Sequence, residues 1–251
     1  MSNLFEGKNV LVTGSTKGIG LEIAKNFTRE GSNTIINSRN EEDCKKISKQ
    51  LNNSIYVSGD VSETESAKRV VEYSLKKLES LDIVICNAGN SSSSVPGKEK
   101  LSDWDMMLND NLFSAINIIN FAKPYLEISK GCIVCISSIC GNNVIKGAPI
   151  TYSVSKAALN AYIRGMATPL GEKGIRINGI APGNILFEGS VWERRLEKQK
   201  EDTEAMIANE VPLNRFGSTL DIASAVSFLC SEESNFITGS VLNIDGGQAS
   251  F

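Results

Sequence analysis

The sequence contains no histidine among its 251 residues. This absence excludes a Ser-His-Asp or Cys-His nucleophile, a zinc site with a histidine ligand, and general-base catalysis by an imidazole. Acid/base chemistry near neutral pH must then use Tyr, Lys, Cys or a carboxylate with a shifted pKa. We expect no metal site in this protein.

A strong excess of one charge is also lacking, since 26 Lys and Arg stand against 29 Asp and Glu and leave a net charge of −3. With a sequence pI near 5.3, the chain has no general attraction for nucleic acid or anionic lipid. No apolar run approaches the roughly 18–20 residues that span a bilayer. The N-terminus has neither the basic nor the apolar region of a signal peptide. We therefore expect a cytoplasmic protein that binds neither nucleic acid nor membrane.

Cysteine is sparse and scattered, with six residues in the whole chain. Cys132 and Cys135 form a C-x-x-C, a spacing that suggests redox or metal chemistry. They lie, however, in the apolar run 132–137, which is typical of a strand, and strand positions three apart point to opposite faces. We expect buried, reduced core cysteines of a cytosolic protein.

Short runs rich in Val and Ile alternate with helical patterns along the whole chain. Strands without polar alternation are buried on both faces, and their alternation with helices implies a parallel sheet. The expected fold is therefore α/β, a single-domain Rossmann-type doubly wound parallel sheet of about seven strands with helices on both faces, over residues 1–251. We expect strands at residues 8–13, 34–37, 55–58, 81–86, 132–137, 176–180 and 241–244, and helices at 18–30, 41–51, 63–78, 104–125, around 152 and at 221–230.

A glycine-rich loop follows the first expected strand and opens the first expected helix. Its glycines permit a tight turn and close approach of the backbone, and a helix N-terminus attracts phosphate. The spacing is G-x-x-x-G-x-G rather than G-x-G-x-x-G, and such clusters also occur as bare turns. The strand–loop–helix position favours a dinucleotide site at Gly14-Ser15-Thr16-Lys17-Gly18-Ile19-Gly20.

The choice of cofactor depends on the end of the second expected strand. NAD sites place an acidic residue there to bind the ribose hydroxyls, but this chain reads Asn37-Ser38-Arg39. Arg39, together with Lys17, can grip a 2′-phosphate, although each taken singly is also typical of a solvated cation. We therefore expect NADP(H) in preference to NAD(H). Asp60-Val61 ends the third strand at the same edge of the sheet, where Asp60 can accept from an adenine amino group, although a capping or turn role is equally typical of it.

The candidate acid/base pair is Tyr152 and Lys156, which share one face of a helix because they are four residues apart. A cation about 4 Å away, at an effective dielectric near 20, stabilises a phenolate by roughly 4 kcal/mol. That would bring the pKa from about 10 toward neutrality. An isolated Y-x-x-x-K is usually an exposed pair on a helix. A catalytic role therefore requires a cofactor site and a partner hydroxyl elsewhere in the chain. Ser138, fourteen residues earlier, can offer a hydroxyl to the same substrate oxygen.

In their joint order and spacing, these motifs resemble those of the short-chain dehydrogenase/reductase family, from about Gly7 to the C-terminus. The resemblance implies that Tyr152 is the acid for carbonyl reduction or the base for alcohol oxidation. It implies that Lys156 lowers the Tyr152 pKa and bonds the nicotinamide ribose, and that Ser138 polarises the substrate oxygen. Asn111 would hold a water that relays protons to Lys156. The cofactor would also be lined by Asn87, Ala88, Gly89, Pro182, Gly183 and Ile185.

The family implies a β-ketoacyl-carrier-protein reductase or general alcohol dehydrogenase type of enzyme, assembled as a homotetramer or homodimer. It would interconvert a carbonyl and a secondary alcohol by hydride transfer with NADP(H). An NAD(H)-dependent sugar or steroid-type alcohol dehydrogenase and a non-catalytic regulator that binds the cofactor are the alternatives. Whether the small-molecule substrate is bound to a carrier stays open. The cofactor half would span residues of about 1–140.

Three departures from the family pattern concern the substrate side. The interval from Ser138 to Tyr152 is one residue longer than usual, Phe187 stands where many relatives carry Thr, and Pro169 should kink or terminate the Tyr152 helix. The substrate-covering region would span residues of about 184–214. Its charged run at 188–204 is most simply a solvated helix face. Phe187 and Trp192 are candidates to face the substrate.

Overall fold

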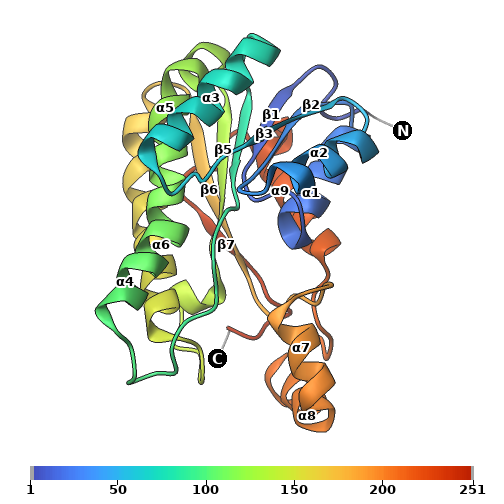
Figure 1. Ribbon diagram of the computed structural model, residues 1–251, viewed down its shortest axis with the longest axis vertical. Helices are drawn as coiled ribbons and strands as arrows, with labels where there is room; N and C mark the ends of the chain where they lie inside the picture. The colour runs from blue at the N-terminus through green and yellow to red at the C-terminus, as the bar shows by residue number, and fades with distance from the viewer. Residues whose placement is uncertain (1–2, 250–251) are drawn as a thin grey trace.

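Residues 3–249, the part of the chain that the computed structural model describes, contain a seven-stranded sheet of order β3-β2-β1-β4-β5-β6-β7 (Figure 1). Every pair of neighbouring strands is parallel. The α/β sheet predicted from the sequence is thereby confirmed. The strands are β1 Asn9–Val12, β2 Asn33–Ser38, β3 Ser54–Ser58, β4 Ile83–Cys86, β5 Cys132–Ile136, β6 Arg176–Pro182 and β7 Val241–Ile244.

Helices cover both faces of this sheet. One face packs against α3 (Thr64–Leu78), α5 (Ser114–Ser129) and α6 (Ile150–Gly171). The other packs against α1 (Gly18–Arg29), α2 (Glu41–Gln50) and α9 (Thr219–Cys230), and Figure 1 shows the two layers on either side of the strands. Within the described residues, no helix combines the length and the apolarity needed to cross a membrane.

The two-sided burial of the strands explains their apolar sequences. In β1, Leu11 belongs to the core under α3, α5 and α6, whereas Val10 and Val12 belong to the core under α1 and α9. Cys132 and Cys135 separate in the same way, one into each core, and both are free thiols. The C-x-x-C is therefore a consequence of strand periodicity, as the sequence indicated.

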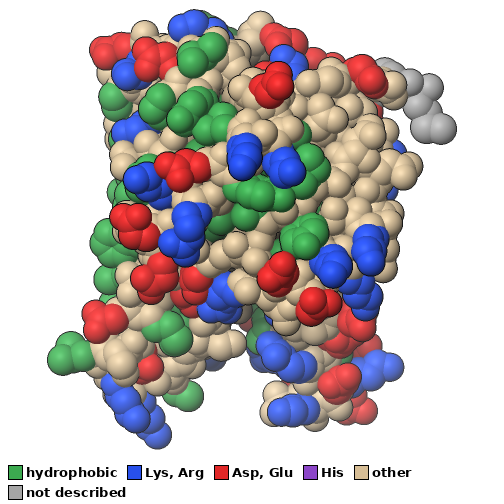
Figure 2. Space-filling view, turned by 45° about the horizontal axis from the view of Figure 1, so that its top comes forward, with side chains coloured by type: hydrophobic (Ala, Val, Ile, Leu, Met, Phe, Trp, Pro, Cys, Tyr) green, Lys and Arg blue, Asp and Glu red, His purple; other side chains and the backbone are tan. Residues whose placement is uncertain are grey.

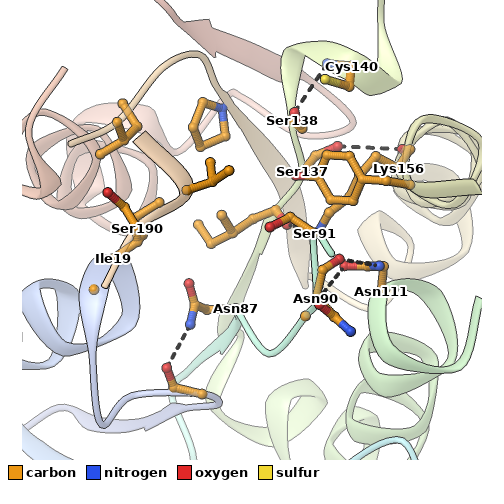
Figure 3. A pocket seen from close by; sticks show the side chains of 18 of the residues that line it. Ile19, Asn87, Asn90, Ser91, Asn111, Ser137, Ser138, Cys140, Lys156 and Ser190 are labelled. Atoms are coloured by element: carbon orange, nitrogen blue, oxygen red, sulfur yellow. Dashed lines mark hydrogen bonds between the residues drawn. The ribbon is translucent and has the colours of Figure 1, made fainter. Parts of the chain in front are cut away.

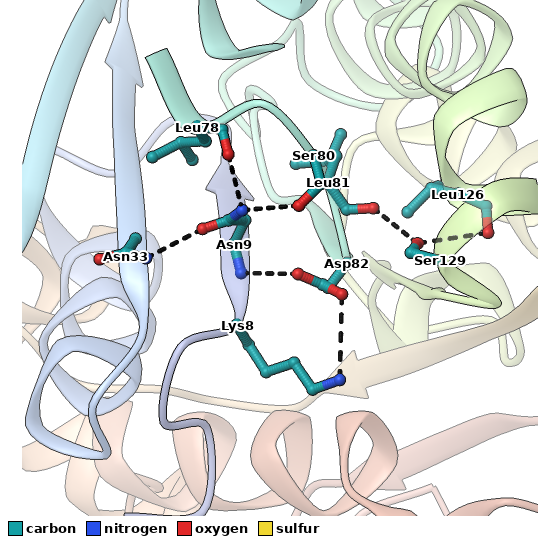
Figure 4. A network of polar contacts seen from close by, with 9 residues as sticks. All are labelled: Lys8, Asn9, Asn33, Leu78, Ser80, Leu81, Asp82, Leu126 and Ser129. Atoms are coloured by element: carbon teal, nitrogen blue, oxygen red, sulfur yellow. Dashed lines mark hydrogen bonds and ion pairs between the residues drawn. The ribbon is translucent and has the colours of Figure 1, made fainter.

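The edge of the sheet at the amino ends of the strands is held by a polar network (Figure 4). The Asn9 side chain donates to the Leu78 carbonyl at 3.0 Å and to the Ser80 hydroxyl at 2.7 Å, and accepts from Asn33 at 3.0 Å. The Asn9 backbone N–H donates to the Asp82 carboxylate at 2.8 Å. A net gain of about 1 kcal/mol per bond is typical of such groups. The network connects β1 to β2 and to the start of β4. It lies at the opposite end of the strands from their carboxyl ends.

The expected helix at 104–125 is interrupted in the structure. It consists of α4 (Leu101–Leu108), a π-helical segment (Asn109–Phe113) and α5. π-Helical turns are rare in proteins, but those that occur are often at functional sites. This one contains the buried Asn111. Pro169 lies in the last turn of α6, which ends two residues later at Gly171. The expected helix end near this proline is thus observed.

Two helices follow β6, where the charged run of the sequence indicated a solvated helix face. They are α7 (Val191–Lys198) and α8 (Lys200–Glu210), which project beyond the carboxyl end of the sheet in Figure 1. In Figure 2 the lower edge of the molecule is hollowed between two projections, and the right-hand one, which carries α7 and α8, mixes Lys and Arg with Asp and Glu side chains.

Candidate active site

A cavity of about 870 Å³ lies at the carboxyl ends of the strands, where open parallel sheets bind their ligands. Its walls come from the β1–α1 loop, the ends of β2 to β6, the loop at 145–149 and α7. Figure 3 shows side chains from these elements turned toward one space. All predicted site residues except Ser15 line it: Gly14, Thr16, Lys17, Gly18, Ile19, Gly20, Ser38, Arg39, Asp60, Val61, Asn87, Ala88, Gly89, Asn111, Ser138, Tyr152, Lys156, Pro182, Gly183 and Ile185.

Ser15 instead joins the loop to the sheet. Its buried hydroxyl donates to the Val12 carbonyl at 2.8 Å and accepts from the Asn37 N–H at 2.9 Å. Its own N–H donates to the Asn37 carbonyl at 2.9 Å. The structure does not bring Ser15 to the cavity, because its polar groups already fix the glycine loop against β2.

The glycine loop has the backbone that its sequence suggested. Gly14 has a φ of +62°, and a Cβ there would lie 3.0 Å from both the Ala88 Cα and the Asn87 Nδ2. The Asn87 amide donates to the carbonyls of Thr13 at 3.0 Å and Gly14 at 2.9 Å. These contacts hold the loop against the end of β4, so that only glycine fits at position 14.

The N-terminus of α1 faces the cavity without a side-chain cap. Lys17 is the N-cap residue in an extended conformation, and it makes no capping hydrogen bond. The first N–H groups of a helix lack intrahelical partners and attract phosphate. Together with the cradle at Gly14, this end of α1 fits the diphosphate of a dinucleotide.

Arg39 and Asp60 lie together at the far end of this region. The Arg39 guanidinium is 3.8 Å from the Asp60 carboxylate, and the Arg39 side chain is 73% exposed. The other Asp60 oxygen accepts from the backbone and the hydroxyl of Ser62 at 3.0 and 2.7 Å. Such an exposed ion pair contributes little to stability, so Arg39 is free to exchange it for a phosphate.

The four predicted catalytic residues surround the centre of the cavity. Lys156 is buried, and its Nζ donates to the Ile136 carbonyl at 2.8 Å and lies 5.9 Å from the centre of the Tyr152 ring. Ser138 caps a 3-10 turn (Ile139–Gly141), with its hydroxyl accepting from the Cys140 N–H at 3.1 Å. Figure 3 shows Ser138 and Lys156 on the same side of the pocket.

Asn111 anchors the loop that follows β4. Its Nδ2 donates to the carbonyls of Asn90 at 2.9 Å and Met107 at 3.1 Å, and its Oδ1 accepts from the Asn90 N–H at 3.1 Å (Figure 3). A Cβ on Gly89 would lie 2.7 Å from the Asn111 Oδ1 and 3.6 Å from the Lys156 Nζ. The absent side chain of Gly89 thus leaves a small space between the amide oxygen and the ammonium.

Comparison with known proteins agrees with this geometry. Residues 14–249 match the family described as Enoyl-(Acyl carrier protein) reductase. The chain belongs to the short-chain dehydrogenase/reductase family. The resemblance inferred from the sequence motifs is therefore confirmed, and the protein is a short-chain oxidoreductase.

Curated and solved members of the short-chain dehydrogenase/reductase family are similar over nearly the full chain. Glucose 1-dehydrogenase of Gluconobacter oxydans is 32% identical over 97% of this chain and 92% of its own. The 3-oxoacyl-(acyl-carrier-protein) reductase FabG of Thermotoga maritima is 33% identical over 96% and 98%. L-Sorbose reductase from Gluconobacter frateurii, solved with NADPH and L-sorbose, has a TM-score of 0.92 at 27% identity and 100% coverage of both chains. The 7α-hydroxysteroid dehydrogenase solved with NADH and 7-oxo glycochenodeoxycholic acid has a TM-score of 0.90 at 28% identity over 98% and 96%.

The electrostatics of this short-chain dehydrogenase/reductase site differ from the sequence-based expectation. Burial raises the pKa of Tyr152 to about 12, and the hydrogen bond of Ser138 opposes this only in part. Burial likewise lowers the pKa of Lys156 to about 8. The expectation that Lys156 brings the Tyr152 pKa toward neutrality was wrong for the protein without cofactor. Loss of hydration on burial is the largest cause of the raised pKa.

Several lining residues were missed by the sequence reasoning. Phe187 and Trp192 do line the cavity, as expected, and the Phe187 ring lies over Gly18. The start of α7 is marked in the sequence by Ser190, a typical N-cap residue, and its hydroxyl accepts from the Glu193 N–H at 3.0 Å. The missed lining residues include Asn90, Ser91, Ser137, Cys140 and Gln248. The predicted substrate-covering region contributes Asn184, Ser190, Arg195, Met206 and Glu210, although only Phe187 and Trp192 were singled out in it.

Proposed function

We propose that the protein is an NADP(H)-dependent oxidoreductase that interconverts a carbonyl and a secondary alcohol. The observation that carries this proposal is the convergence of Tyr152, Lys156 and Ser138 on the cavity that also contains the glycine loop. A bound nicotinamide cofactor would supply the hydride, and the protein must then manage one proton and the substrate oxygen. NADH in one similar structure and NADPH in another leave both cofactors within the range of the family.

Tyr152 is proposed as the group that gives or takes this proton. With a pKa of about 12 the free enzyme holds the phenol protonated, which suits an acid for carbonyl reduction. The Ser138 hydroxyl lies close enough to act on the Tyr152 phenol, so both hydroxyls can reach one substrate oxygen. Cys140 lies close to Ser138, but burial raises the pKa of its thiol. The thiol is therefore a poor alternative to Tyr152 as the group that transfers the proton.

Lys156 and Asn111 are proposed to carry the proton onward. The Lys156 ammonium makes one hydrogen bond, to the Ile136 carbonyl, which leaves two N–H groups available. Asn111 uses both amide hydrogens but retains a lone pair on its Oδ1 beside Gly89. A water in the space at Gly89 would bridge the two groups and supply protons to Lys156.

NADP(H) is proposed in preference to NAD(H) because the end of β2 carries Arg39 and no carboxylate. Lys17 lines the same part of the cavity and is exposed. Asp60 is the nearest negative charge, and it is already bonded to Arg39 and Ser62. A 2′-phosphate would draw Arg39 away from Asp60 and gain a charge-assisted hydrogen bond.

The substrate, the assembly and the location are proposals from the family. The named relatives suggest 3-oxoacyl thioesters, sugars and oxo steroids as substrate classes to compare. A homotetramer or homodimer is supported by large apolar side chains exposed on α4, α5 and the turn between them, among them Met106, Phe113 and Tyr125. A cytoplasmic location fits the six free thiols.

The proposal is tested by following NADPH absorbance with a 3-oxoacyl thioester, L-sorbose, and a 7-oxo steroid. We expect at least one substrate to be reduced, and Tyr152→Phe to lower kcat by about 100- to 10,000-fold, the usual contribution of general acid catalysis. Tyr162→Phe, on the same helix but packed into the core, is the matched control and should keep activity. Equal turnover by Tyr152→Phe and wild type would refute the assignment.

A further inference from the structure

One face of α7 turns an aromatic ring and a cation toward the cavity. Trp192 and Arg195 are three residues apart, on the same side of the helix, and both line the cavity. Arg194, the next residue, is exposed and does not line it. The chain therefore offers two adjacent arginines of which only one faces the substrate space.

The Arg195 guanidinium lies over an aromatic ring at cation–π distance. The guanidinium carbon lies 5.5 Å from the centre of the Trp192 ring. That ring in turn packs against Phe216, with centroids 5.7 Å apart and an angle of 51°. A stacked guanidinium keeps its in-plane N–H groups free, in the fork that matches a carboxylate or a phosphate.

No protein anion uses this fork in the part of the chain that the structure describes, where the Arg195 side chain has neither an ion pair nor a hydrogen bond. Two carboxylates lie two residues away in sequence: Glu193 accepts instead from the Gly189 N–H at 2.6 Å, and Glu197 is exposed and forms no ion pair with Arg195. Glu210, which also lines the cavity, accepts from the Gln248 amide at 3.4 Å. Lys146, from the loop at 145–149, also lines the cavity.

We propose that Arg195 binds an anionic group of the substrate, a carboxylate or a phosphate remote from the reacting carbon. The inference rests on the proposed function, since it names the substrate class of that site. The phosphates of a bound cofactor would be held at Gly14, Lys17 and the uncapped start of α1. An unpaired, half-buried cation on the helix that covers the cavity is therefore left for the substrate.

Trp192 provides a direct reporter of this binding. The chain has two tryptophans, and the other, Trp104 on α4, does not line the cavity. In Trp104→Phe protein saturated with NADP⁺, all tryptophan fluorescence arises beside Arg195. The probes are straight-chain methyl-ketone acids of increasing length, beginning with levulinate, and their methyl esters. The series varies the distance between the ketone and the carboxylate, so that no particular distance is assumed.

We expect a saturable fluorescence change with an acid of suitable length, at an apparent Kd at least about tenfold below that of its ester, the usual scale of a charge-assisted hydrogen bond. Arg195→Gln should remove this preference, Arg195→Lys should keep part of it, and Arg194→Gln should leave it unchanged. Equal binding of acid and ester throughout the series would overturn the inference. So would an acid preference that survives in Arg195→Gln.

The cofactor is the other possible source of an anion, and the same variants decide this. If Arg195 served the cofactor diphosphate, Arg195→Gln would weaken NADP⁺ binding at least about tenfold. The affinities for the acid and for the ester would then fall alike, and this result would overturn the inference. An unchanged Kd for NADP⁺ would also show that the variant is folded. Because the fluorescence needs no turnover, loss of the acid preference is distinguishable from failure of the proposed reaction, which Tyr152→Phe tests.

Discussion

The ammonium nitrogen of Lys156 lies 5.9 Å from the centre of the Tyr152 ring. Burial favours the neutral form of each group, because it raises the pKa of Tyr152 and lowers the pKa of Lys156. The phenol holds its proton up to a pKa of about 12, while the ammonium loses its proton at a pKa of about 8. In the free enzyme both groups are therefore protonated below pH 8, and above pH 8 Tyr152 alone keeps its proton up to about pH 12. Lys156 is a buried charge near neutral pH, and a buried charge costs stability.

Replacing Lys156 by Met should therefore stabilise the free protein at pH 7. The pKa of Lys156 is lowered from 10.5 to about 8, a penalty of about 3 kcal/mol below pH 8. Loss of the hydrogen bond to Ile136 offsets about 1 kcal/mol of the gain. We expect Lys156→Met to unfold in urea with a free energy higher by about 2 kcal/mol, and to lack activity.

The pH dependence of unfolding distinguishes removal of the buried Lys156 charge from better packing of the Met side chain. Between pH 8 and 10.5 the unfolded chain binds the proton that folded Lys156 has released, so wild-type stability rises with pH relative to the variant. The advantage of Lys156→Met should shrink from pH 8 to pH 10, below the range in which Tyr152 contributes. Lys45→Met, on the exposed side of α2, should leave the profile unchanged. An advantage that stays constant up to pH 10 would contradict the explanation.

Gly89→Ala tests the space between Asn111 and Lys156. The added methyl group would lie 2.7 Å from the Asn111 Oδ1 and 3.6 Å from the Lys156 Nζ, where the proposed bridging water belongs. We expect kcat to fall by about tenfold or more because proton transfer is impeded, with a smaller change in stability. Gly165→Ala on α6 meets no atom within 4 Å and is the control. An unchanged kcat in Gly89→Ala would remove the water from the proposed route.

Much of the fold and the site follows from the sequence, because strands and their carboxyl ends are encoded locally. The apolar run of β1 and the glycines after it define both the strand and the turn, and the structure places Gly14 with the positive φ that the turn requires. Once the strands are parallel, the residues after each strand must meet at one edge. This is why Asn87, Ser138 and Arg39 share a cavity although they are far apart in sequence.

The remainder depends on contacts that no local pattern encodes. The π-helical turn at Asn111 breaks an otherwise regular helical periodicity, and the side of the cavity that α7 faces is set by packing of Trp192 on Phe216. Ser15 looked like its neighbours in the glycine loop, but the strand pairing turns it inward. The pKa of Tyr152 required its burial, which spacing alone does not give.

Phe187 and Gly18 should be energetically coupled. Gly18 has a φ of +55°, and a Cβ there would lie 2.6 Å from the Phe187 ring. Gly18→Ala should cost about 1–3 kcal/mol from backbone strain and this contact. In a Phe187→Ala background only the strain remains, so the cost should fall by at least about 0.5 kcal/mol. Urea unfolding of the four proteins measures the coupling, and strictly additive effects would show that the ring moves aside freely.

The cofactor preference leads to the last prediction. If Arg39 leaves Asp60 to bind a 2′-phosphate, Arg39→Ala should weaken NADPH binding by about tenfold or more and change NADH binding little. Asp60→Asn removes the competing carboxylate, which is 3.8 Å from Arg39, and should tighten NADPH binding a few-fold. Lys45→Ala controls for the loss of one positive charge on the same side of β2. Titration of each variant with both cofactors gives the ratio of the two Kd values, and a wild-type preference for NADH would overturn the NADP(H) assignment while leaving the hydride chemistry intact.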